Sequence, residues 1–174
     1  MRALVISGGG SKGAFAGGVA QYLMQEKKHQ YDLLLGTSTG SLLIPHLALG
    51  NIDKIYDIYT NVNMEKIFSI NPFVIKNKNE VDIVTINHFN VIKQFLKGKR
   101  TFGESQHLKK YIRENFSLSE FNQLKSSNCN IVITVTNLSK NEAEYKCIRD
   151  FEYDEFCDWI WISCNYIPFM SLVT

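Results

Sequence analysis

Gly36-Thr37-Ser38-Thr39-Gly40 is the stretch of this sequence from which its fold can be inferred. An apolar run at residues 33–35 precedes it and a second apolar run at residues 42–44 follows it. A short apolar run, a serine between glycines and another apolar run predict a strand, a sharp turn and a helix. The pattern G-x-S-x-G is that of a nucleophile elbow, in which a strained turn presents the serine Oγ at the start of the helix. The alternative is a glycine-rich turn in which Thr37 or Ser38 only caps the helix.

A second glycine-rich segment, Gly8-Gly9-Gly10-Ser11-Lys12-Gly13, directly follows a strand predicted at residues 3–6. Because it satisfies G-x-G-x-x-G, a dinucleotide site is an alternative, but that site needs an acidic residue at the end of the second strand. Here the Ser38 segment occupies that position, and Asp32 lies at the strand's beginning. A P-loop fits less well, since Lys12 is followed by Gly13 and not by Ser or Thr.

Both glycine segments follow strands that we expect to be neighbours in a parallel sheet, where functional groups gather at the carboxyl ends of the strands. The N–H groups of Gly9, Gly10 and Ser11 would then face the point where Ser38 attacks a carbonyl carbon. Acyl transfer needs such donors, because they stabilise the developing oxyanion. The sequence therefore predicts a serine nucleophile beside an oxyanion hole formed by residues 8–13.

The two motifs resemble those of the patatin-like phospholipases, G-G-G-x-[RK]-G for the oxyanion loop and G-x-S-x-G for the elbow. Residues 135–138 and 162–168 are similar to that family's strand-end segment and to its Ser-rich helix end before a proline. The resemblance covers nearly the whole chain and is weakest over residues 61–127. It implies one domain over residues 1–174, with a parallel-sheet, three-layer α/β/α hydrolase fold. It also implies acyl-ester hydrolysis of lipids, as phospholipase A or lipid esterase, with no metal or other cofactor.

The resemblance further implies a catalytic base, an aspartate in a D-G-[GA] motif after the Ser/Pro segment. This sequence contains no Asp-Gly pair. Surface or core roles are more ordinary for the acids and histidines that remain, Asp150, Asp154, Asp158, His46, His88 and His107. We therefore expect a domain truncated at its C-terminus and inactive in this form. A non-catalytic module that keeps the fold and binds lipid or a partner protein is the alternative.

Composition narrows the functional classes. The chain has 174 residues, of which 45% are hydrophobic, and a net charge of only +2, which argues against nucleic acid as a partner. No run approaches the ~20 apolar residues of a membrane span, and no signal peptide is evident, so we expect a cytoplasmic protein. The four cysteines show no metal-binding spacing and are expected to be reduced.

A membrane surface is nevertheless a candidate partner. Residues 76–113 contain nine Lys and Arg against three acidic residues, and a basic face can meet anionic lipid. Phe68, Ile70, Phe73, Val74 and Ile75 lie next to Lys76 and Lys78, and this combination suits a lipid interface. The alternative is that these apolar side chains close over the core.

The hydrophobic periodicity predicts the remaining elements. Strands are expected at residues 3–6, 31–35, 129–135 and 143–148, helices at 14–28, 39–49, 51–59, 104–115, 154–164 and the second half of 81–96, and a loop at 68–75.

Overall fold

The computed structural model describes residues 1–78 and 80–173. The chain divides into two compact units. The first consists of Met1–Asn61 and Ile112–Cys164, and the second of Val62–Tyr111 with the segment that follows Cys164. The assignment of residues 1–174 to one domain stays a prediction.

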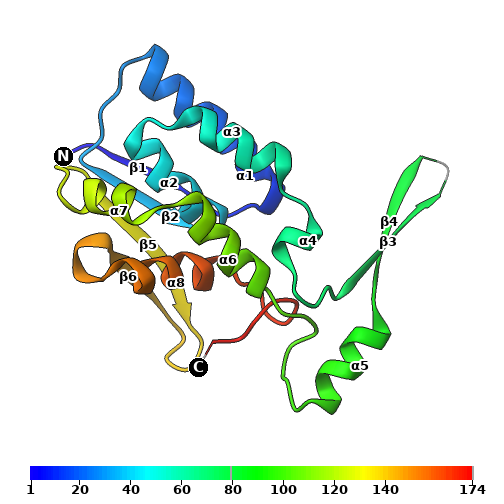
Figure 1. Ribbon diagram of the computed structural model, residues 1–174. Coiled ribbons are helices and arrows are strands. Elements are labelled where there is room, and N and C mark those ends of the chain that lie inside the picture. The colour runs from blue at the N-terminus through cyan, green and yellow to red at the C-terminus, as the bar shows by residue number, and fades with distance from the viewer. Residues whose placement is uncertain (79, 174) are drawn as a thin grey trace. The chain divides into compact units, whose positions relative to one another are not determined.

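A four-stranded sheet in the order β1-β2-β5-β6 lies at the centre of the first unit (Figure 1). Its strands are β1 (Ala3–Ile6), β2 (Leu33–Thr37), β5 (Asn130–Asn137) and β6 (Glu142–Cys147). β2 runs parallel to both β1 and β5, and β6 returns antiparallel to β5. The expected parallel arrangement of the first strands is confirmed, and β6 makes the sheet mixed.

Helices cover one face of this sheet. They are α1 (Gly13–Gln21), α2 (Thr39–Leu49), α3 (Ile52–Asn61), α7 (Leu118–Lys125) and α8 (Tyr153–Cys164), with short helical turns at Gly10–Lys12, Tyr22–Glu26 and Ile148–Asp150. α2 contacts α1, α3, α7 and α8, and both α2 and α8 contact β5, so these helices lie on the same side. The α/β fold class is therefore confirmed, whereas the three-layer α/β/α arrangement stays a prediction, because the described helices form a layer on one face of the sheet. On the opposite face, at the edge strand β1, Val5 is 64% exposed.

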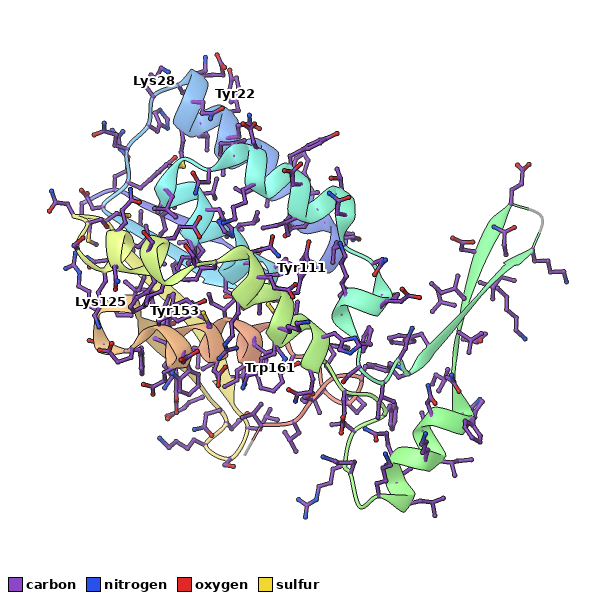
Figure 2. The ribbon with its side chains drawn as sticks, viewed as in Figure 1. Tyr22, Lys28, Tyr111, Lys125, Tyr153 and Trp161 are labelled. Carbon is purple, nitrogen blue, oxygen red and sulfur yellow. The ribbon has the colours of Figure 1, made fainter. Side chains whose placement is uncertain are left out.

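The core of the first unit lies between the sheet and these helices. Leu34, Ile131 and Ile133 point from the strands into it, and α2 contributes Leu43, Ile44 and Leu47. Phe116, Phe121 and Phe156 add an aromatic cluster with ring centroids 5.9–6.5 Å apart. Tyr153, labelled in Figure 2, donates a hydrogen bond from its hydroxyl to the Phe116 carbonyl oxygen at 2.7 Å. Full burial of each such side chain contributes roughly 1.5–3 kcal/mol, so this cluster stabilises the helical layer.

Helix α7 was not expected from periodicity, although its start carries a capping signal. Ser117 accepts a hydrogen bond from the Glu120 N–H, and the Glu120 carboxylate accepts one from the Ser117 N–H. The same carboxylate accepts from Lys54 Nζ at 2.7 Å and from Asn51 Nδ2 at 3.1 Å. Glu120 therefore joins α7 to the start of α3.

These contacts shift the titration of Glu120. Burial alone would raise its pKa, but the hydrogen bonds from Lys54 and Ser117 outweigh burial and lower the pKa to about 2. A carboxylate with a depressed pKa stabilises the folded chain above its unfolded pKa and loses that effect as the pH falls toward the folded pKa.

The second unit contains a hairpin and shorter helices. They are α4 (Met64–Ile67), β3 (Phe73–Lys78), β4 (Val81–Ile86) and α5 (His88–Leu96), followed by α6 (Gln106–Asn115), which crosses the boundary between the units. The loop predicted at residues 68–75 is wrong from Phe73 onward, because β3 pairs antiparallel with β4 and Pro72 stands just outside the strand. The helix predicted for the second half of 81–96 is confirmed as α5.

Aromatic rings form the core of the second unit. Phe73 stacks on Phe169 with centroids 5.1 Å apart and meets Phe68 edge-on at 6.0 Å, and Phe102 meets Phe169 at 5.5 Å. Phe68 is buried and Phe73 half-buried. Their rings therefore serve packing, and of the five apolar residues proposed for lipid contact only Ile75 is exposed.

We predict that Glu120→Gln destabilises the protein by about 1–3 kcal/mol at pH 7, because the charged hydrogen bonds with Lys54 and Ser117 are lost. The difference from wild type should shrink as the pH falls from about 4.5 to about 2, where Glu120 itself becomes protonated. Urea unfolding at several pH values measures this. Glu155→Gln, at an exposed position on α8, is the control. A difference that does not change with pH would contradict the assignment.

Candidate active site

Ser38 occupies the turn between β2 and α2, so the predicted strand, sharp turn and helix are all present. Its backbone has φ 54° and ψ −122°, a left-handed conformation that a residue with a Cβ rarely adopts. Such conformations cost roughly 1–3 kcal/mol and persist only where the surroundings impose them. The turn places the Ser38 side chain, half-buried, at the amino end of α2.

Side chains from α2 and α8 hold the peptide groups of Ser38. Its N–H donates to Ser163 Oγ at 2.8 Å, and Ser163 Oγ in turn donates to the Thr134 carbonyl oxygen at 2.8 Å. The Ser38 carbonyl oxygen accepts hydrogen bonds from Ser41 Oγ at 2.5 Å and from Cys164 Sγ at 3.3 Å. The backbone of the turn is thereby fixed on both sides, and these bonds do not involve the Ser38 hydroxyl.

The two glycines of the motif are required by close backbone packing. A Cβ on Gly36 would stand 2.5 Å from the Gly40 carbonyl carbon, and a Cβ on Gly40 would overlap the Ile6 carbonyl oxygen. The backbone of α2 therefore packs against those of β2 and β1 with no room for a side chain at Gly36 or Gly40. Thr37 ends β2 beside Thr134, and Thr39 begins α2.

The loop after β1 reaches Ser38. A Cβ on Gly8 would lie 2.8 Å from Ser38 Cβ and 3.5 Å from Ser38 Oγ, so the Gly8 backbone rests directly on the serine side chain. Residues Gly8, Gly9, Gly10, Ser11 and Lys12 are exposed. In the described residues no hydrogen bond uses the N–H groups of Gly9, Gly10 or Ser11. The loop thus presents free donors next to Ser38.

Gly13, the last residue of the loop motif, has a packing role. It is buried at the start of α1, and a Cβ there would meet the Tyr59 hydroxyl and the Thr39 side chain. Gly13 therefore lets α1 approach α2 and α3, while the exposed residues before it line the open side of the loop.

Within the described residues no base is paired with the serine. Over residues 1–78 and 80–173 the Ser38 hydroxyl makes no hydrogen bond. His46, on α2, is buried against Phe116, and burial together with nearby Lys54 lowers its pKa to about 4. Asp154 and Asp158 pair with Arg113.

The remaining candidates for a base lie elsewhere. Asp150 is exposed in the turn before α8. In the second unit, His107 Nδ1 contacts the Glu65 carbonyl oxygen and His88 is exposed at the start of α5. None of these three has a hydrogen bond to Ser38 among the described residues.

Ser163 is the site residue that sequence reasoning missed. Residues 162–168 were recognised as a Ser-rich helix end, but nothing in them showed that the Ser163 hydroxyl would reach a backbone N–H 125 positions earlier. Cys164, for which the sequence predicts only a reduced thiol, donates to the Ser38 carbonyl oxygen. Both contacts depend on where α8 packs.

The fold and this geometry agree with a comparison to known families. A family model described as patatin-like phospholipase matches residues 4–174. The chain therefore belongs to the patatin-like phospholipase family. A search of curated proteins found no match to the sequence.

The described residues hold neither a metal-binding cluster nor a helix that could span a membrane. Among the described residues no group of three or more His, Cys, Asp or Glu side chains is placed to hold a metal ion. Within the same residues no helix has the length and apolar character needed to cross a membrane.

We predict that Ser163→Ala lowers the free energy of unfolding by about 1–3 kcal/mol, because it leaves the Ser38 N–H and the Thr134 carbonyl oxygen without their partner. Ser139→Ala, an exposed position in the turn after β5, should change stability by less than about 0.5 kcal/mol. Urea unfolding of both variants measures the difference. Equal stability of the two would show that Ser163 does not support the turn.

Proposed function

We propose that this chain is a serine-dependent lipid acyl hydrolase in which Ser38 is the nucleophile and the loop at residues 8–13 forms the oxyanion hole. The substrate class, lipid acyl esters, follows from membership of the patatin-like phospholipase family. The observation that carries the proposal is the contact between Gly8 and the Ser38 side chain, which brings free N–H donors beside a strained, half-buried serine.

The reaction follows from this arrangement. Ser38 Oγ attacks the ester carbonyl carbon, and its proton must leave as the new C–O bond forms. The carbonyl oxygen becomes an oxyanion, which the N–H groups of Gly9 and Gly10 stabilise. The ester bond then breaks, the alcohol leaves with a proton, and water hydrolyses the acyl-enzyme. Removal of one oxyanion donor typically costs ~3–4 kcal/mol of transition-state stabilisation, so the loop is a major part of this mechanism.

The step that these residues leave unassisted is removal of the serine proton. A serine is a weak nucleophile without an adjacent base, and the Ser38 hydroxyl has no hydrogen-bond partner among the described residues. Because none of the described residues is placed to take that proton, we expect this 174-residue chain to turn over p-nitrophenyl acyl esters slowly. A non-catalytic module is the second candidate, and the observation that favours it is that no base contacts Ser38 in the part of the chain that the structure describes.

We predict that a fluorophosphonate probe labels Ser38 slowly at pH 7 and about tenfold faster for each pH unit up to pH 10. Without a base the alkoxide is the reacting species, so the rate should follow hydroxide. Labelling time courses analysed by mass spectrometry measure it, with Ser38→Ala as the control that takes up no probe. A rate that levels off near neutral pH would reveal a base within the chain. Complete absence of labelling up to pH 10 would favour the binding module.

A second prediction tests the oxyanion loop. Gly8→Ala should slow labelling of Ser38 at pH 9 by at least about tenfold, because the added Cβ meets the Ser38 side chain at 2.8 Å and separates the loop from the serine. Gly18→Ala, in α1, is the matched control, since a Cβ there meets no atom within 4 Å. If both variants label at the wild-type rate, the loop at residues 8–13 does not take part in the chemistry.

A further inference from the structure

Helix α5 in the second unit turns its apolar side outward. Phe89, Ile92 and Leu96 follow one another at helical spacing and are 76%, 57% and 84% exposed. On the opposite side Gln94 is fully buried, and in the described residues neither atom of its side-chain amide has a hydrogen-bond partner. A helix facing water shows the reverse pattern, with polar residues outside and apolar residues inside. The outer side of α5 is therefore suited to an apolar environment.

The adjoining hairpin is exposed in the same way. Among the residues that the structure describes, β3 and β4 pair with each other and with no other strand, and side chains stand out from both of their faces (Figure 2). Ile75 pairs with Val84 on one face, and on the other Lys76 pairs with Ile83 and Lys78 with Val81. These aliphatic side chains are 43–63% exposed. An isolated two-stranded hairpin is at most marginally stable in water, so this one needs a contact to stabilise it.

The hairpin and α5 are joined to each other at the base of β3 in the second unit. α5 begins two residues after β4 ends, and its first turn is fixed to the base of β3 (Figure 1). The Asn87 N–H donates to the Pro72 carbonyl oxygen at 2.7 Å, and Asn90 Nδ2 donates to the Asn71 carbonyl oxygen at 2.8 Å. We call the exposed side chains of β3, β4 and α5 the hairpin–α5 surface.

The charge of this surface identifies its partner. Six basic residues lie on β3, on α5 or in the four residues after α5, against three acidic ones, Glu80, Asp82 and Glu104, and Glu104 forms an ion pair with Lys99 at 3.3 Å. The basic residues are Lys76, Lys78, Lys93, Lys97, Lys99 and Arg100. Long basic side chains next to exposed aromatic and aliphatic groups match an anionic membrane, where the apolar groups enter the acyl boundary and the cations remain with the phosphates. A neutral protein groove would satisfy the apolar groups but not the excess of positive charge.

We propose that the hairpin–α5 surface docks the protein on an anionic lipid bilayer, with Phe89, Ile92 and Leu96 inserted at the headgroup boundary. This replaces the lipid contact expected from residues 68–75, whose phenylalanines pack within the second unit. Docking requires no reaction at Ser38. The docking proposal can therefore be correct or wrong independently of the proposed hydrolysis.

The test is co-sedimentation of the 174-residue chain with sucrose-loaded vesicles of phosphatidylcholine alone or with 30% phosphatidylserine. We expect binding to the anionic vesicles, weaker binding to the neutral ones, and a decrease with added salt. Leu96→Glu should reduce anionic-vesicle binding about tenfold or more, because it removes an inserted side chain and adds a negative charge. The matched control is Leu118→Glu, which makes the same change at an exposed position on α7 and should bind like wild type.

A second pair of variants tests the electrostatic part without altering an apolar residue. Lys76→Gln with Lys78→Gln should lower binding about fivefold for each lysine, since a basic residue near an anionic surface contributes about 1 kcal/mol. Lys27→Gln with Lys28→Gln, at the end of the first helical segment, is its control, and Ser38→Ala should bind like wild type.

Three results would overturn the proposal. They are binding by Leu96→Glu equal to that of Leu118→Glu, no binding of wild type to anionic vesicles, or a wild-type dimer in sedimentation velocity that Leu96→Glu dissociates in the absence of lipid. The last result would assign the hairpin–α5 surface to self-association. Circular dichroism of each variant shows whether it is folded. If Leu96→Glu is unfolded, the binding of the lysine variants tests the proposal in its place.

Discussion

The left-handed backbone of Ser38 is the constraint on which the rest of the site depends. Holding a serine at φ 54° destabilises the folded chain by roughly 1–3 kcal/mol, and each hydrogen bond to its peptide groups stabilises it by about 1 kcal/mol. Ser163, Ser41 and Cys164 supply three such bonds, so the contacts are of the right size to offset the strain. Two of these side chains come from α8, and the conformation of Ser38 therefore depends on the packing of a helix far along the sequence.

Close backbone packing at two glycines also ties the Ser38 turn to the sheet. Gly40 rests on the Ile6 carbonyl oxygen, which fixes the end of β1 against the start of α2. The loop that leaves β1 must then pass over the turn, and Gly8 is the residue that lies on the Ser38 side chain. The buried residues Leu43 and Leu47 anchor α2 in the core. The position of the loop at residues 8–13 therefore depends on the packing of the core.

Local sequence was enough to predict the parts of the structure that depend on neighbours in the chain. The strand, turn and helix around Ser38 follow from two apolar runs and two glycines, and the parallel pairing of β1 with β2 follows from the helix between them. Residues 68–75 predict a loop because they contain Pro72, and the structure differs because Phe73–Lys78 pairs with β4, whose own periodicity is mixed. The start of α7 was missed although the Ser117 to Glu120 capping pattern is legible in the sequence. The contact from Ser163 was beyond sequence reasoning, because only the packing of α8 brings it to Ser38.

Burial of the Cys164 thiol has a consequence for the durability of the turn. Burial raises its pKa to about 12, against a smaller opposing effect of the hydrogen bond with Ser41. Oxidants and alkylating agents react with thiolates, so this sulfur remains a protonated donor under conditions that modify accessible cysteines. Cys129 and Cys147, which are less buried, would be modified first. Under oxidative stress the turn at Ser38 would thus keep its sulfur contact after the thiols nearer the surface had been modified.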